Sequence, residues 1–344
     1  MALNLLHKRA DPGWLRETSV WVERQLTAQN RRPTGPGVEA RVLPWSAVFR
    51  FPTAAGDVYF KACAPSQGFE PALARYLAER RPDDVLPVLA ADLERAWLLL
   101  PDGGPVLRYV LRNDMADLGR HWSAILPQVA AMQVALTDDA RHLLSLGVLD
   151  RRPSVLPALF REVLERDDWP LDHPDSLSRD DLPRIRAFAP RLDDLCAELA
   201  ALGPADTLVH DDFHDGHVFV QGDPAAARYR FFDFGDACVG HPFFQMVAPQ
   251  RFYARAYDDL EADDETANSL YELYMRAWAA DGVTPELRRA LDLALAVGPL
   301  IRALTWVHAL GSHYPHIEPE LMRHYALGVG HWLGELEGRS QRLS

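Results

Sequence analysis

One stretch of sequence decides the fold of this chain: Leu208-Val209-His210-Asp211-Asp212-Phe213-His214-Asp215-Gly216-His217-Val218-Phe219-Val220. In it, two apolar segments enclose a loop crowded with aspartate, histidine and glycine. A further apolar run, Tyr229-Arg230-Phe231-Phe232, comes next and leads directly into Asp233-Phe234-Gly235-Asp236. This run and the end of the first stretch predict the two strands of a short hairpin. Because paired strands place their ends side by side, we expect Asp212 and Asp233 to converge on one site.

Two carboxylates at converging strand ends suit a particular chemistry. A divalent cation needs an oxygen ligand and a reacting hydroxyl needs a proton acceptor, and phosphoryl transfer uses both. Aspartate and histidine are also common in surface turns, where they stabilise the backbone. Here the polar groups are enclosed by hydrophobic strands, which favours a functional site over a simple turn.

The same blocks carry a resemblance to a known family. His-x-Asp, a strand, a turn, a second strand and Asp-Phe-Gly resemble the aminoglycoside phosphotransferases, which are related to choline kinases and protein kinases. Members typically read His-Gly-Asp-x-His-x-x-Asn, then Ile-Asp-Trp, then Gly-x-Pro-x-x-Asp. The corresponding blocks of this chain span residues 210–217, 232–234 and 240–245. The resemblance in order and spacing extends over residues 38 to 335.

The resemblance implies an α+β, protein-kinase-like fold with two lobes. The small N-terminal lobe would be an antiparallel sheet with one helix, and the larger C-terminal lobe would be mainly helical. Asp212 would be the catalytic carboxylate, which accepts or orients the proton of a substrate hydroxyl. Asp233 would ligate Mg²⁺ that bridges the phosphates of the donor nucleotide, ATP or GTP. His210 would support the backbone of the loop rather than act on the substrate.

The N-terminal half of the chain fits this architecture. An amphipathic helix is expected at 12–29, followed by a break rich in proline and glycine. The expected strands are 38–43, 47–51, 57–63, 85–89 and 96–100, and a helix is expected at 71–80. Lys61 lies in the middle of the third strand between apolar neighbours, where a lysine is unusual unless it stands on a solvated edge.

Further residues are assigned to the nucleotide by the resemblance. In kinase-like proteins the strand lysine contacts the phosphates and pairs with a glutamate of the next helix. Glu70 is the candidate, although a glutamate at a helix N-terminus is also favourable by about 0.3–1 kcal/mol. The hinge that binds adenine through backbone groups would lie around Leu99 and Leu100. Ser46, at a hairpin tip where a phosphate-covering loop belongs, either contacts a phosphate or has a plain turn role.

Helical periodicity prevails beyond Gly103-Gly104. It predicts helices at 106–112, 115–136, 154–166, 180–201, 241–257, 263–281, 285–311 and 318–337. We therefore expect three parts. They are an N-terminal helical extension at 1–37, a nucleotide-binding lobe at 38–103, and a helical lobe at 104–344 that contains the catalytic and metal-binding hairpin.

Three positions depart from the family pattern. His217 stands in place of the asparagine that helps to hold the metal, Asp211 in place of glycine, and Gln245 in place of an aspartate. An imidazole nitrogen suits Mn²⁺ or another transition metal better than Mg²⁺. His217 therefore ligates a metal and changes its identity, or donates a hydrogen bond to phosphate, or leaves Mg²⁺ to Asp233 alone. The last case would make the chain a catalytically degenerate, nucleotide-binding relative.

A different class of enzyme stays open. One loop has the ligand types and the close spacing of a transition-metal site, as in a metal-dependent hydrolase: His210, Asp212, His214 and His217. This interpretation explains the loop alone. The kinase-like interpretation also explains Lys61, the hinge and Asp233.

The composition is that of a globular protein and restricts the partners. With 36 basic and 49 acidic residues among 344, the net charge of −13 argues against nucleic acid and mildly favours a cationic small substrate. The three cysteines are far apart, which indicates a reducing compartment. No signal-peptide run and no uncharged apolar stretch of membrane-spanning length is evident. We expect a cytoplasmic protein with neither a membrane nor a nucleic-acid partner.

The acceptor is the part of the reaction that the sequence determines least. The default is a hydroxyl of a small molecule: an aminoglycoside-like antibiotic, an amino alcohol or another metabolite. The acidic run at 258–265 could face a cationic acceptor, but a charged loop between helices is usually just solvated.

Overall fold

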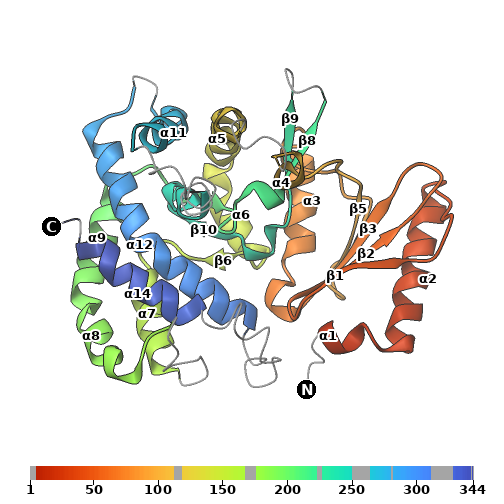
Figure 1. Ribbon diagram of the computed structural model, residues 1–344, viewed down its shortest axis with the longest axis horizontal. Coiled ribbons are helices and arrows are strands. Elements are labelled where there is room, and N and C mark those ends of the chain that lie inside the picture. Colours follow the sequence, from red (N-terminus) through yellow and green to blue (C-terminus); the bar gives the residue numbers. More distant parts are fainter. Residues whose placement is uncertain are drawn as a thin grey trace. The chain divides into compact units, whose positions relative to one another are not determined.

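The computed structural model describes residues 5–111, 118–166, 176–222, 227–249, 264–279, 282–310, 328–341 and 343 (Figure 1). The chain divides into two compact units. The first comprises Met1–Leu107 with His217–Gly235, and the second comprises Arg108–Gly216 with Asp236–Ser344. The hairpin is thus grouped with the first unit, and not with the helical lobe in which the sequence predicts it.

The first unit is built on a five-stranded antiparallel sheet. Its strands are β1 (Val38–Val42), β2 (Ser46–Phe51), β3 (Val58–Cys63), β4 (Ala90–Asp92) and β5 (Trp97–Pro101), in the order β1-β2-β3-β5-β4. The prediction of a strand at 85–89 was wrong, because β4 begins at Ala90. Pro87 has no N–H to donate to a sheet ladder, so regular pairing begins beyond it. The other four strands match the predicted segments to within one residue at each end.

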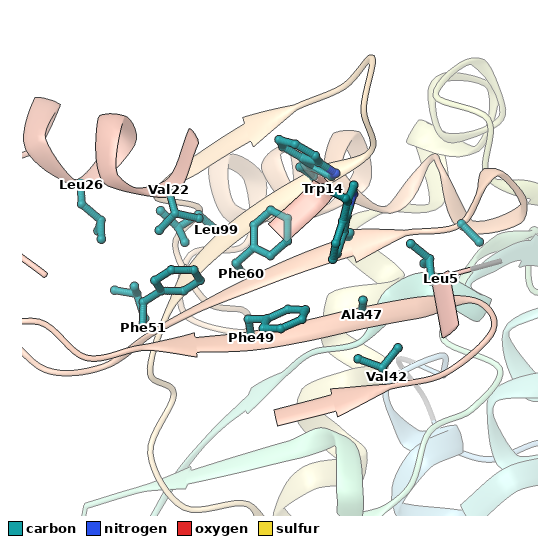
Figure 2. Close-up of a cluster of buried hydrophobic side chains, with 14 residues drawn as sticks. Leu5, Trp14, Val22, Leu26, Val42, Ala47, Phe49, Phe51, Phe60 and Leu99 are labelled. Carbon is teal, nitrogen blue, oxygen red and sulfur yellow. The ribbon is translucent and has the colours of Figure 1, made fainter. Parts of the chain in front are cut away.

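Helix α2 (Pro12–Ala28), preceded by the short α1 (Leu5–Lys8), covers one face of this sheet (Figure 2). Trp14 of α2 lies with its ring centroid 6.0 Å from that of Phe49 and 6.5 Å from that of Phe60. Side chains alternate along a strand, so the residue that follows Phe60 points to the opposite face. Lys61 is therefore directed away from α2 and toward α3 (Glu70–Arg80), with which it forms an ion pair.

The hairpin predicted from the motif is present. It pairs β8 (Val218–Gln221) with β9 (Arg228–Phe231), and Val218 lies opposite Phe231. Beyond the strands, the backbone N–H of Phe232 donates to the carbonyl oxygen of His217 at 3.2 Å. This bond holds the residue before β8 against the residue after β9.

The second unit is mainly helical and contains a three-stranded sheet in the order β6-β10-β7. The strands are β6 (Leu149–Asp150), β7 (Thr207–Val209) and β10 (Cys238–Gly240). The helices are α5 (Leu118–Ala135), α6 (Ala140–Ser145), α7 (Leu156–Glu165), α8 (Leu182–Ala187), α9 (Ala189–Ala201), α11 (Asp264–Arg276), α12 (Pro285–Leu310) and α14 (Gly328–Gln341), while α4 (Leu107–Val110) begins at the last residue of the first unit's N-terminal segment.

One predicted helix of this unit is divided. Residues 180–201 form a 3₁₀ turn at Arg179–Asp181 followed by α8 and α9. Each helix has a proline in its first turn, Pro183 and Pro190. Proline is well suited to a helix start but cannot donate the bond that a continuous helix needs, which explains the break. A helix was also predicted at 241–257. The structure has a 3₁₀ helix at Pro242–Met246, and residues 250–257 lie outside the described residues.

Helix α12 forms the core of the second unit. Among the described residues it is the helix long and apolar enough to cross a membrane, but most of that stretch is buried inside the protein. Such burial is typical of the central helix of a globular core. Its Gly298 lies so close to a neighbouring side chain that a Cβ there would stand 2.2 Å from Cγ2 of Val247.

This close approach leads to a first prediction. Gly298→Ala should lower the free energy of unfolding by about 1–3 kcal/mol because the added methyl group overpacks the core. Gly338→Ala, in the exposed part of α14 where a Cβ would meet nothing within 4 Å, should instead stabilise by about 0.5–1 kcal/mol. Urea unfolding of both variants measures the difference. Equal effects would contradict the packing of α12.

Candidate active site

Lys61 is buried near the middle of β3. Its Nζ atom lies 2.7 Å from Oε1 and 2.6 Å from Oε2 of Glu70, the first residue of α3. The same atom lies 2.6 Å from Oδ1 of Asp233. Only 8% of Lys61 and 3% of Glu70 are exposed, so the ion pair lies away from bulk water. The predicted contact between Lys61 and Glu70 is confirmed, and Asp233 adds a second carboxylate to it.

These contacts keep Lys61 charged. Burial by itself would lower the pKa of its ammonium group, but the charges of Asp233 and Glu70 outweigh burial and raise that pKa well above its usual value. Burial raises the pKa of the Glu70 carboxyl, an effect that Lys61 opposes. The Sγ atom of Cys63 lies 3.3 Å from Oε2 of Glu70, and burial followed by the Glu70 charge raises the pKa of this thiol. Cys63 therefore stays a neutral donor to the pair.

Asp233 is held in an uncommon backbone conformation directly after the hairpin. Its φ of 65° lies in the left-handed region, which strains any residue that carries a Cβ. Residues with such strain cluster at functional sites. The Oδ2 atom of Asp233 lies 3.4 Å from Nε2 of His217, and 38% of the Asp233 side chain is exposed, against 10% for His217. Asp233 is thus the member of this group that a ligand can reach.

His217 is fixed by the hairpin on which it stands. Its ring packs edge-on against Phe232 with 5.7 Å between ring centroids, and Phe232 stacks on Phe219 at 4.1 Å. The imidazole is therefore oriented toward Asp233 by packing as well as by the backbone. A carboxylate oxygen and an imidazole nitrogen form a donor pair that fits a divalent cation, with a nitrogen ligand that favours Mn²⁺ or another transition metal.

In the second unit, the loop after β7 binds α12 through two consecutive aspartates. Oδ1 of Asp212 lies 2.8 Å from Nη2 of Arg302, and Oδ2 of Asp211 lies 3.0 Å from Nη1 of the same guanidinium. The hydroxyl of Thr305 donates to Oδ2 of Asp211 at 2.6 Å. Asp211 has a φ of 60°, the left-handed conformation that glycine adopts without strain. The missing glycine is evident in the sequence, whereas these partners are not.

The second oxygen of the Asp212 carboxylate faces a histidine. Oδ2 of Asp212 lies 3.5 Å from Nε2 of His214. The other ring nitrogen, Nδ1, accepts a hydrogen bond from the backbone N–H of Gly216 at 2.9 Å and lies 3.0 Å from Nη2 of Arg108. Both of these partners are donors, which assigns the ring proton to Nε2. His214 therefore presents an N–H to Asp212.

A buried network supports the backbone that leads into this loop. The N–H of His210 donates to Oε1 of Gln245 at 2.9 Å, and the amide of Gln133 donates to the carbonyl oxygen of Leu208 at 2.8 Å. The hydroxyl oxygen of Tyr274 contacts Oε1 of Gln133 and lies 2.7 Å from the carbonyl oxygen of Pro242, so its single hydrogen can be donated to either. Gln245 thus provides an acceptor for the backbone that leads into this loop. The ring of His210 packs against Phe213 at 5.5 Å.

The residues assigned to adenine and to the phosphate-covering loop lie in the sheet. Ser46 opens β2, and its carbonyl oxygen accepts a bond from the N–H of Leu43 at 2.8 Å. Leu99 is buried in β5, where its carbonyl oxygen accepts from the N–H of Leu89 at 2.9 Å. Leu100 lies half-buried beside it, opposite Tyr59. Their contacts with nucleotide stay predictions. Of the acidic run, residues 258–263 lie outside the described part of the chain.

Sequence reasoning missed Arg302, Thr305, Gln133 and Tyr274. The signal for Arg302 was present: it is the single charged residue in the long apolar run 293–307 of α12. A charge in such a run is almost never buried without a partner. The partner itself lies about ninety positions earlier, and no local pattern indicates it.

No protein-family model matches this chain, and no curated protein matches it by sequence. Solved structures do. A macrolide 2'-phosphotransferase type I is similar with a TM-score of 0.53 and 14% identity, over 94% of this chain and 96% of that one. A choline/ethanolamine kinase family protein from Mesorhizobium loti is similar with a TM-score of 0.54 and 14% identity, over 94% of this chain and 92% of that one.

A thermostable mutant of aminoglycoside phosphotransferase APH(4)-Ia, in a ternary complex with ADP and hygromycin B, is also similar. Its TM-score is 0.55 and its identity 12%, over 94% of this chain and 97% of that one. The α+β, kinase-like fold and the resemblance to these phosphotransferases are thereby confirmed. Identity this low establishes the fold, and the activity has to be argued from the residues.

Proposed function

We propose that this chain, which has the fold of the aminoglycoside phosphotransferases and choline kinases, transfers the γ-phosphoryl group of ATP or GTP to a hydroxyl of a small molecule. The observation that carries the proposal is the buried Lys61, whose Nζ is held between Glu70 and Asp233. An ammonium group of fixed charge beside a partly exposed carboxylate suits nucleotide phosphates and their metal ion.

Each residue then has a role in one displacement. The acceptor hydroxyl oxygen forms a bond to the γ-phosphorus, and the bond from this phosphorus to the β,γ-bridging oxygen breaks. Asp212 orients the hydroxyl and takes its proton, and the nucleoside diphosphate leaves with the bridging oxygen. Lys61 balances charge on the phosphates. Asp233 and His217 would hold the divalent cation, which neutralises charge on the phosphate oxygens when bound.

The acceptor class follows from what surrounds Asp212. In the described part of the loop, Asp211 and Asp212 share Arg302, and Asp215 pairs with Arg108 at 2.7 Å. These ion pairs reduce the negative charge available to a cation, which supports including neutral as well as cationic acceptors. Choline, ethanolamine, a macrolide and hygromycin B form a first panel, because similar structures are named for them.

Nucleotide binding is the direct test of the proposal. Thermal melting with ATP or GTP, each with Mg²⁺, Mn²⁺ or Zn²⁺, should reveal stabilisation that requires both nucleotide and metal. A ligand at about one hundred times its Kd stabilises the folded state by about 2.7 kcal/mol. If no nucleotide stabilises the protein, the kinase interpretation fails. Stabilisation by Zn²⁺ alone would favour the metal-dependent hydrolase instead.

The second prediction concerns the metal. His217→Asn replaces an imidazole nitrogen by the amide oxygen that magnesium prefers, so it should shift the preference of nucleotide-dependent melting from Mn²⁺ toward Mg²⁺. The control is His142→Asn, on the surface of α6 and outside the proposed site. It should leave the ratio of the two metals unchanged. An unchanged ratio in His217→Asn would remove His217 from the metal site.

A second candidate function is a degenerate nucleotide-binding protein without transfer activity. It is favoured by the ion pair that Arg302 forms with Asp212, because a neutralised carboxylate is a weaker proton acceptor. In that case metal and nucleotide stabilise the protein, but no acceptor of the panel is phosphorylated. Product formation therefore separates the two candidates.

A further inference from the structure

Arg302 is the charged residue among the buried side chains of α12. Helix α12 is otherwise apolar in this region, so apolar packing does not explain a guanidinium in the core of the second unit. Three nearby carboxylates compensate its positive charge. Burial by itself would lower the pKa of Arg302, but the charges of Asp211, Asp212 and Asp236 raise it. The guanidinium is therefore permanently charged.

Two residues, Asp211 and Thr305, fix the orientation of the guanidinium. Oδ2 of Asp211 accepts a hydrogen bond from Nη1 of Arg302 at 3.0 Å. The hydroxyl of Thr305, one helical turn beyond Arg302, donates to the same oxygen at 2.6 Å. Residues three apart on a helix share a face, so Arg302 and Thr305 together clamp the Asp211 carboxylate. Asp211 does this from the strained left-handed conformation with a φ of 60°.

The two terminal nitrogens of the guanidinium, Nη1 and Nη2, bind different carboxylates. An arginine that only neutralised Asp211 would be expected to use both nitrogens on it, since the bidentate pair is the stronger geometry. Here Nη2 turns instead to Oδ1 of Asp212, at 2.8 Å. Nε2 of His214 lies 3.5 Å from the other oxygen, Oδ2. The hydrogen bond from Arg302 therefore sets the orientation of the Asp212 carboxylate.

We propose that Arg302 is a positioning residue for Asp212, held on target by Asp211 and Thr305. The proposal rests on the phosphotransferase function proposed above. In this proposal Asp211 has a functional role, because its carboxylate orients the guanidinium of Arg302 toward the carboxylate of Asp212. Arg302 contacts neither acceptor nor nucleotide in this role and acts through Asp212 alone.

The double variant Asp211→Gly/Arg302→Met tests the proposal. It removes both buried charges together and places glycine where φ is positive, so the fold loses no charge balance. Loss of positioning should lower kcat by about 10²-fold, the cost of misplacing a reacting group by about 1 Å, with KM for the nucleotide unchanged. Arg289→Met removes another arginine of α12, one that pairs with Glu198 on the surface, and should leave kcat unchanged.

The readout is release of phosphate from ATP to water, with Mg²⁺ and with Mn²⁺, so that it does not depend on the identity of the acceptor. Asp212→Asn gives the background rate. A double variant with wild-type kcat would overturn the proposal, because Arg302 would then serve only to neutralise Asp211. If the wild type itself does not exceed Asp212→Asn, the proposed function fails, and the role of Arg302 falls with it.

If the double variant melts far below the wild type, kcat and KM of Arg302→Lys are compared with those of the wild type instead. The lysine keeps a positive charge beside Asp211, but a single ammonium group does not reproduce a fork that spans two carboxylates. A reduced kcat at unchanged KM supports the positioning role. A wild-type kcat in Arg302→Lys overturns it.

Discussion

Asp212→Asn is expected to lower the rate of phosphoryl transfer by about 10²–10⁴-fold while the nucleotide still binds. An amide has the shape of the carboxylate and keeps an oxygen that can accept from Arg302, so the loop after β7 retains its contacts. It cannot take up the proton of the acceptor hydroxyl. The loss should therefore appear in kcat, with melting in the presence of nucleotide and metal unchanged.

The control for this variant is Asp193→Asn, which changes an exposed aspartate paired with Arg161 on the surface. Exposed pairs contribute about 0–1 kcal/mol, so neither activity nor melting should change much. Transfer at the wild-type rate in Asp212→Asn would show that the catalytic carboxylate lies elsewhere. Lost nucleotide binding would show that the variant acts on the fold of the site.

Lys61→Met is expected to have the second large effect, on both stability and activity. Removing one member of a buried ion pair costs about 3–5 kcal/mol because the remaining charge is uncompensated. Glu70 would be that charge, since it is 3% exposed. Under the proposed function Lys61 stabilises the nucleotide phosphates, so its loss should lower kcat/KM by about 10²–10³-fold. Urea unfolding and transfer kinetics measure the two effects separately.

The stability effect of Lys61→Met should depend on pH. Burial raises the pKa of Glu70, and without Lys61 nothing in the pair opposes that rise. A group with a raised folded-state pKa contributes stability that is complete below its unfolded pKa and is lost as the pH rises through the folded pKa. The deficit relative to wild type should therefore be small near pH 4.5 and grow toward neutral pH. Lys61→Met/Glu70→Gln should show no such growth, and if it did, Glu70 would not be the group responsible.

The parts of the site that were predictable are those with a local signal. Lys61 stands out because its strand is otherwise apolar, and Glu70 follows at the start of the next helix. The hairpin with Asp212 before it and Asp233 after it is one continuous stretch, so spacing alone indicates it. The strand predicted at 85–89 shows the limit of such reasoning, since a run of apolar residues outweighed Pro87 in the prediction.

The parts that were missed depend on side chains from distant elements. The sequence identifies Asp211 as a departure from the pattern of the family that the chain resembles, with a Cβ and a charge where glycine is usual. Its compensation lies on α12, where Arg302 and Thr305 bind its carboxylate. Periodicity identifies α12 as a helix but does not state which of its residues meets which loop. The same holds for Gln133 and Tyr274, whose hydrogen bonds to the carbonyl oxygens of Leu208 and Pro242 arise only when the helices pack.

The proposed transfer of a phosphoryl group from a nucleotide to a small hydroxylated molecule has a direct test. It is mass spectrometry of the acceptor panel after incubation with γ-¹⁸O-labelled ATP or GTP and Mg²⁺ or Mn²⁺. The account predicts a phosphorylated acceptor that carries the label and is missing when Asp212→Asn replaces the wild type. An acceptor phosphorylated equally by Asp212→Asn, or no labelled product with any nucleotide, metal and acceptor of the panel, would contradict it.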